Sequence, residues 1–139
     1  MQPLAEEVSN QDVKTPKSKN RILVIDDESD ITLTFELILG GEGFEVDSFN
    51  DPYIALSNFR PGIYDIVLID VKLPQMDGFD LYRKLKNIDE NVKYCFITAS
   101  RVYYDALKKD YLDLDVDWFI RNPIDAEQLV NEIQSKLHS

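Results

Sequence analysis

Ile66-Val67-Leu68-Ile69-Asp70 is a run of four apolar residues, three of them β-branched, that ends on a carboxylate. The residues that follow, 71–78, include a proline and a glycine and are typical of a loop. An apolar run of this length between turn signals predicts a strand buried on both faces, as in the centre of a parallel sheet. Because ligands bind just beyond the carboxyl ends of such strands, Asp70 is a candidate site residue, and capping of the turn is the alternative.

Two further apolar runs end on polar side chains in the same way. Residues 21–25 lead into Asp26-Asp27, and residues 94–97 lead into Thr98. Parallel strands bring their carboxyl ends to one edge of a sheet, so we expect these side chains to converge with Asp70. Three carboxylates in one crevice raise one another's pKa unless a cation joins them. Oxygen ligands with room for water suit Mg²⁺, so the sequence predicts a magnesium site.

Strand and helix signals alternate along the chain. Expected strands lie at residues 21–25, 44–49, 66–70, 92–97 and 118–120, and expected helices at about 29–39, 52–60, 79–88, 102–110 and 126–137. This alternation predicts an α/β fold with a doubly wound parallel sheet and right-handed crossovers. Residues 44–49 alternate apolar and polar side chains, which predicts an edge strand with one wetter face.

Acidic and hydroxyl side chains mark the expected helix starts. Ser29 or Asp30 is expected to cap the first helix, Asp51 the second and Asp125 the fifth. Residues 31–39 of the first helix are rich in large apolar side chains, so we expect much of its circumference to be covered.

The net charge of the chain restricts its partners. The 139 residues carry a formal net charge of −11, and the acidic and basic side chains of residues 1–20 cancel. The whole excess therefore belongs to the residues that follow. Such a field repels phosphate backbones, so we expect no direct binding to DNA or RNA, and it favours a divalent cation.

The remaining composition points to one domain. Residues 1–19 are polar and without periodicity, which predicts a disordered N-terminal tail before a single domain at 20–139. Cys95 is the one cysteine and lies in an apolar run, so it makes no internal disulfide and fits a reducing cytoplasm. The sequence contains no signal peptide and no apolar run of 18 residues, so nothing indicates a membrane.

Five motifs resemble, in order and spacing, those of a response-regulator receiver domain. They are Asp26-Asp27 after the first strand, Asp70 after the third, the loop Lys72–Gly78, Thr98-Ala99 after the fourth strand and Phe119–Ile124 after the fifth. The resemblance covers about residues 21–138. It implies a flavodoxin-like (βα)5 sandwich, similar to chemotaxis regulators, whose five strands follow the order 2-1-3-4-5.

The resemblance also implies the chemistry of the site. Asp70 would accept a phosphoryl group from the phosphohistidine of a sensor histidine kinase or a phosphotransfer protein. Asp27 and Asp70 would bind Mg²⁺ directly, Asp26 largely through water, and Lys72 through its backbone carbonyl. Thr98 would offer its hydroxyl to a phosphoryl oxygen. A carboxylate needs no base to act as nucleophile at pH 7, and Mg²⁺ neutralises charge on the transferring group.

The fifth motif departs from the family pattern. Where the family places a lysine before the proline, this chain has Asn122, which brings no charge. Arg121 is not expected to replace the lysine, because strand alternation groups it with Phe119 and groups Asn122 with Ile120. The intact magnesium ligands predict that phosphorylation persists, with weaker transition-state stabilisation or switching. The resemblance allows a cis bond between Asn122 and Pro123.

The resemblance also predicts how a signal would leave the domain. Thr98 and Phe119 match the family's switch positions, and their movement would alter the face formed by the fourth helix, the fifth strand and the fifth helix. Tyr103, Tyr104 and Tyr111 cluster near that face and suit a binding surface. Few residues follow the fifth helix, so we expect a stand-alone regulator that binds a downstream protein target.

Two other functions compete with this interpretation. Asn122 favours a degenerate receiver that binds partners without phosphorylation, whereas the complete acidic set opposes it. A magnesium-dependent phosphatase with an aspartyl nucleophile usually has a second acidic residue two positions later. That position holds Lys72, so we expect no enzyme beyond self-catalysed phosphorylation and dephosphorylation.

Overall fold

The computed structural model describes residues 20–99 and 118–138. The strands are β1 (Arg21–Ile25), β2 (Glu45–Phe49), β3 (Ile66–Asp70), β4 (Lys93–Thr98) and β5 (Trp118–Arg121), and the helices are α1 (Ser29–Gly41), α2 (Pro52–Asn58), α3 (Gly78–Ile88) and α5 (Ala126–Leu137). Three predicted features lie outside the described residues: the tail at 1–19, the helix at 102–110, and the tyrosines near the signalling face, Tyr103, Tyr104 and Tyr111. None of the described helices has the length and apolar content needed to span a membrane.

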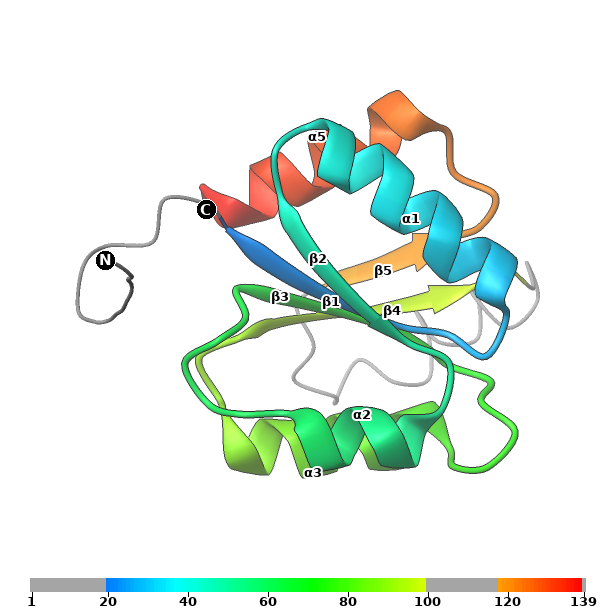
Figure 1. The fold of residues 1–139 in the computed structure, drawn as a ribbon, viewed down its shortest axis with the longest axis vertical. Coiled ribbons are helices and arrows are strands. Elements are labelled where there is room, and N and C mark those ends of the chain that lie inside the picture. Colours follow the sequence, from blue (N-terminus) through cyan, green and yellow to red (C-terminus); the bar gives the residue numbers. More distant parts are fainter. Residues whose placement is uncertain (1–19, 100–117, 139) are drawn as a thin grey trace, which may run out of the picture.

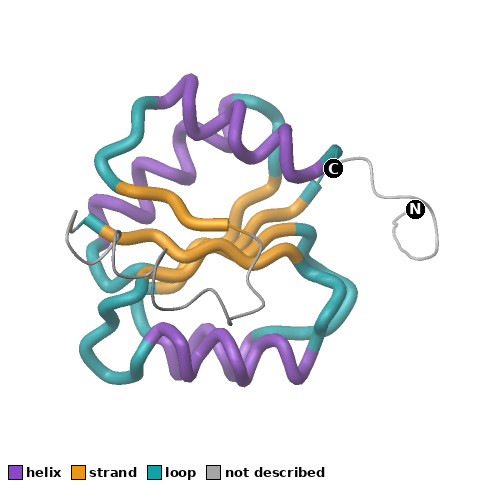
Figure 2. Tube along the Cα trace, turned by 180° about the vertical axis from the view of Figure 1, so that it is seen from behind, coloured by secondary structure: helices purple, strands orange, loops and turns teal. Residues whose placement is uncertain are grey.

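The five strands form one parallel sheet in the order β2-β1-β3-β4-β5, which confirms the predicted topology. The strand β2 lies at the edge, as its alternating pattern predicted. Two helical layers cover the sheet, with α1 and α5 on one face and α2 and α3 on the other (Figure 1). The view from behind shows the same three layers (Figure 2).

The central strand β3 is buried on both faces, as its apolar run predicted. Ile66 and Leu68 belong to the core beneath α1 and α5, whereas Val67 and Ile69 belong to the core against α2 and α3. All four side chains are completely buried. Successive side chains of a strand point to opposite faces, so an uninterrupted apolar run fills both cores at once. The strand therefore carries Asp70 to a fixed place at the sheet edge.

The helix α1 is covered on fewer sides than its composition predicted. Phe35 and Leu39 are buried against the sheet, but Leu33 is 54 % exposed and Leu37 is 68 % exposed. A helix in an outer layer packs only against the sheet and its neighbouring helix, so its outer face stays in solvent. The prediction of broad coverage was wrong, because apolar content does not reveal how many elements surround a helix.

The predicted caps hold for α2 and α5 and fail for α1. The Asp51 carboxylate accepts hydrogen bonds from the backbone N–H groups of Tyr53 and Ile54, and the Asp125 carboxylate accepts one from Gln128. The N-cap of α1 is Glu28, which makes no side-chain cap bond. Ser29 is already the first helical residue. The acidic turn before α1 does not cap this helix, and its carboxylates lie at the edge of the sheet instead.

Candidate functional site

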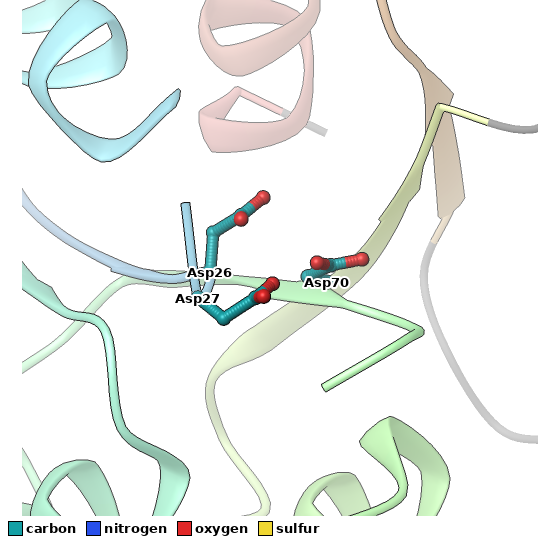
Figure 3. A group of neighbouring side chains, drawn as sticks. All are labelled: Asp26, Asp27 and Asp70. Carbon is teal, nitrogen blue, oxygen red and sulfur yellow. The ribbon is translucent and has the colours of Figure 1, made fainter. Parts of the chain in front are cut away.

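Three carboxylates meet at the carboxyl ends of two neighbouring strands (Figure 3). Ile25 pairs with Ile69 in the parallel register of β1 and β3, so the next residues along the chain, Asp26 just after β1 and Asp70 at the end of β3, lie side by side. Asp26, Asp27 and Asp70 each offer an oxygen atom, and these atoms lie within 4.8 Å of one another. The convergence expected from the strand ends is therefore present.

Hydrogen bonds from the following turns orient two of these carboxylates. Oδ1 of Asp26 accepts from the backbone N–H of Glu28 at 2.9 Å, and Oδ1 of Asp70 accepts from that of Lys72 at 3.1 Å. Aspartates commonly bond the backbone two residues later in turns. Asp70 therefore caps its turn as well as facing the acidic crevice, and the two interpretations of this residue are compatible.

Burial and mutual repulsion make the ionised site unfavourable. Burial, together with the Asp26 charge, raises the pKa of Asp70 to about 8. Burial also raises the pKa of Asp26 to about 6, with a further contribution from the Asp27 charge. Within residues 20–99 and 118–138, none of these three carboxylates forms an ion pair with a basic side chain. A divalent cation would relieve the repulsion, and the all-oxygen donor set fits Mg²⁺.

Gly78, the first residue of α3, lies close to the backbone of Asp70 and Val71. A Cβ atom at this position would lie 2.6 Å from the backbone oxygen of Asp70 and 2.8 Å from that of Val71. The Gly78 N–H donates to the Val71 carbonyl at 3.1 Å, which closes the loop onto the strand end. The sequence prediction treated Gly78 only as a loop residue. The sequence did contain a signal for the close approach: Gly78 stands at the first position of a helix, directly after an aspartate that caps this helix.

The structure brings Thr98 and Asn122 together beside the strand ends that carry the three carboxylates. Thr98 ends β4, which is hydrogen-bonded to β3, and its carbonyl accepts a hydrogen bond from the Asn122 N–H at 2.8 Å. Asn122 is 8 % exposed, whereas the adjacent Arg121 is exposed. The two side chains therefore follow the alternation that the sequence predicted. The Asn122-Pro123 bond is cis, as the resemblance allowed.

Phe119 lies half-buried on the face of the sheet that carries α2 and α3. Its ring centroid is 5.9 Å from that of Phe96, which is part of the core on that face. Part of the surface predicted to surround Phe119 falls at 102–110, outside the described residues. The proposed switch role of Phe119 and the predicted metal contact of the Lys72 carbonyl stay predictions.

The chain belongs to the response regulator receiver domain family, whose profile matches residues 22–134. It is 32% identical over 114 residues to the transcriptional regulatory protein DltR of Streptococcus agalactiae, with 82% of this chain and 50% of that protein aligned. It is also 32% identical over 119 residues to the DNA-binding response regulator MtrA of Mycobacterium tuberculosis, with 86% of this chain and 51% of that protein aligned. The chain thus spans about half the length of these relatives.

Solved receiver domains share the fold. A CheY-like receiver domain protein from Methanospirillum hungatei has a TM-score of 0.74 and 27% identity, and the match covers 87% of this chain and 95% of that one. The response regulator TrrA of Thermotoga maritima, solved in complex with Mg²⁺ and BeF, has a TM-score of 0.72 and 25% identity over 84% of this chain and 98% of that one. Receiver domains are signalling modules that interact with histidine kinases and bind Mg²⁺ at an acidic pocket.

Proposed function

We propose that Asp70 accepts a phosphoryl group from a sensor histidine kinase or phosphotransfer protein in a magnesium-dependent reaction. The observation that carries this proposal is the position of the Asp70 carboxylate, at a strand end with its oxygen within 4.8 Å of oxygens of Asp26 and Asp27. An open cleft of about 470 Å³, lined by Asp27 and residues 71–77, adjoins the acidic crevice. We propose that a phosphodonor and water approach the nucleophile through this cleft.

The reaction uses Asp70 as a nucleophile. The Lys72 N–H holds Oδ1 of Asp70, so we assign the attack on phosphorus to Oδ2. A P–O bond to Asp70 forms as the P–N bond of the phosphohistidine breaks, and the imidazole leaves. Asp26, Asp27, Asp70 and the Lys72 carbonyl would hold Mg²⁺, which supplies charge neutralisation when bound. TrrA, which resembles this chain, was solved with Mg²⁺ and BeF, and this supports the assignment.

Two neighbouring side chains are assigned to the transferred group. Thr98 would donate its hydroxyl to a phosphoryl oxygen from the adjacent strand end. Asn122 would add a neutral hydrogen-bond donor where the family has a cation. A neutral donor stabilises negative charge less than a lysine does in a partly buried site. This chain should therefore react, but more slowly than a receiver with the lysine.

The signal would leave through protein contacts on the face of β5, α5 and the predicted helix at 102–110, with Thr98 and Phe119 as the switch pair. We propose a signalling protein that works in the cytoplasm and is no enzyme toward a separate substrate. The buried free thiol of Cys95 supports a reducing compartment. DltR and MtrA are named as a transcriptional regulator and a DNA-binding regulator, but the charge of −11 argues against nucleic-acid binding by this chain itself.

Incubation with Mg²⁺ and acetyl phosphate is expected to add one phosphoryl group to the wild-type chain. Intact-mass spectrometry measures the adduct. Asp70→Asn is expected to lack it because an amide, unlike a carboxylate, is not a nucleophile at neutral pH. Omission of Mg²⁺ should also suppress the adduct. An adduct of equal yield in Asp70→Asn would reject Asp70 as the acceptor.

The alternative function is a receiver that binds partners without phosphorylation, and Asn122 is the observation that favours it. Asn122→Lys restores the missing charge and is expected to speed phosphorylation by at least severalfold, because a cation stabilises the transferring group better than an amide. The measurement is the rate of adduct formation by mass spectrometry. Arg121→Lys is the matched control, since this side chain is exposed and should leave the rate unchanged.

The two functions differ in the result for the wild-type chain. Absence of any adduct under conditions that label another receiver domain would favour the phosphorylation-independent module. Equal phosphorylation rates in wild type and Asn122→Lys would remove the assigned role of position 122.

A further inference from the structure

The side chain of Asn50 bonds the backbone of the acidic pair. Its Nδ2 group donates to the carbonyl oxygen of Asp26 at 2.7 Å and to Oγ1 of Thr32 at 3.1 Å. Asn50 directly follows β2, and the last residue of β2, Phe49, accepts a hydrogen bond from the Asp26 N–H at 3.1 Å. Two consecutive residues therefore hold the backbone of Asp26: Phe49 bonds its N–H and Asn50 bonds its carbonyl oxygen.

The bond from Asn50 acts on the peptide group that joins Asp26 to Asp27. A peptide unit is planar, so an anchor on its carbonyl also fixes the direction in which the chain enters Asp27. The angle between the two carboxylate side chains depends on that plane. A carbonyl oxygen can only accept, so the amide of Asn50 must face it with its NH₂ group, which fixes the orientation of the amide.

Thr32 anchors the same amide to the first helix. Its side chain is buried, and its hydroxyl donates to the Ser29 carbonyl at 3.1 Å while it accepts from Asn50. A hydroxyl has one hydrogen to donate and two lone pairs, so both bonds can form together. Asn50 thereby uses both of its N–H hydrogens, one on α1 and one on the peptide between the acidic residues.

We propose that Asn50 is a positioning residue for the divalent cation, acting through the Asp26–Asp27 peptide that it holds. It does not touch the ion itself. Its bond keeps the Asp27 carboxylate directed toward Asp70, so that the three carboxylates are arranged before the ion arrives. The inference rests on the proposed function, because it assumes that these carboxylates bind Mg²⁺.

Titration of the full chain with MgCl₂, followed through backbone amide shifts by NMR, tests the proposal. Asn50→Ala is expected to weaken Mg²⁺ binding by about tenfold, the lower end of the effect of groups that orient metal ligands. Asp51→Ala is the matched control, because the adjacent Asp51 caps α2 and bonds the Tyr53 N–H at 2.8 Å. It is expected to lower the free energy of unfolding while the Kd for Mg²⁺ stays unchanged.

Asn50→Asp separates positioning from charge. The variant keeps the shape of the side chain but replaces the donor with a carboxylate, which cannot bond the Asp26 carbonyl. Positioning predicts that the Kd for Mg²⁺ rises at least as much as in Asn50→Ala. Simple electrostatics predicts the opposite, because an added negative charge attracts the cation. Tighter binding in Asn50→Asp would overturn the proposal.

Other outcomes are equally decisive. An unchanged Kd in Asn50→Ala, or equal weakening in Asp51→Ala, also overturns the inference. If Asn50→Ala does not fold, Asn50→Asp decides the inference alone, and an unchanged Kd there overturns it as well. A wild-type chain that neither binds Mg²⁺ nor forms the adduct contradicts the proposed function instead.

Discussion

Gly78→Ala is expected to lower the free energy of unfolding by about 3 kcal/mol, near the upper end of the usual cost of overpacking. The added Cβ atom would lie 2.6 Å from the Asp70 carbonyl oxygen and 2.9 Å from the Val71 Cα atom. Both neighbours are backbone atoms at the end of the central strand, so neither can rotate away. The close contact can therefore be relieved only if the loop moves, or the strand end that carries Asp70.

Gly40→Ala is the matched control for this substitution. Gly40 lies within α1, and a Cβ atom there would meet nothing within 4 Å. Alanine is favoured over glycine within a helix, so we expect the free energy of unfolding to rise by about 0.5–1 kcal/mol. Urea unfolding measures both variants. A Gly78→Ala chain as stable as wild type would mean that the loop after β3 yields easily, and that Gly78 does not fix the position of Asp70.

The sheet and its acidic edge could be predicted because their signals are local in the sequence. The apolar run of β3 revealed a strand buried on both faces, and the three carboxylates lie at the carboxyl end of an apolar run or directly after it. The order of the strands came from the resemblance to receiver domains, since periodicity does not determine which strands are neighbours. The opposite exposure of Arg121 and Asn122 followed from alternation alone.

Other features depend on contacts between distant segments. Asn50 and Asp26 are separated by 24 positions, and nothing near either residue reveals the bond between them. Leu33 and Leu37 carry the same apolar signal as their buried neighbours, so only the layer arrangement shows that they face solvent. The tight contact at Gly78 depends on how a loop closes against a strand end, which propensity does not describe.

The affinity for Mg²⁺ is expected to rise with pH between about 6 and 8, by up to about tenfold per pH unit for each proton displaced. The pKa of Asp70 is raised to about 8 and that of Asp26 to about 6, so the metal-free site holds protons in this range. A cation must displace them. Calorimetry in buffers of different ionisation enthalpy measures both the affinity and the number of protons released.

The same shifts determine how the stability of the metal-free chain depends on pH. The folded state binds these protons more tightly than the unfolded state, whose aspartates titrate near 3.9. The resulting stabilisation is complete below about pH 4 and is lost as the pH rises through about 6 for Asp26 and about 8 for Asp70. The free energy of unfolding contributed by the site therefore falls with rising pH, and added Mg²⁺ should restore more of it at pH 8 than at pH 6.

Asp70→Asn provides the control for this pH dependence. It removes the carboxyl group with the highest pKa, so the loss of stability between about pH 6 and 8 should flatten, while the loss due to Asp26 between about pH 4 and 6 persists. Urea unfolding with a chelator across this range measures the effect. If the affinity of the wild-type chain for Mg²⁺ is constant from pH 6 to 8, all three carboxylates are already ionised in the absence of the metal. Mutual repulsion of the carboxylates, and not displacement of protons, would then limit Mg²⁺ binding.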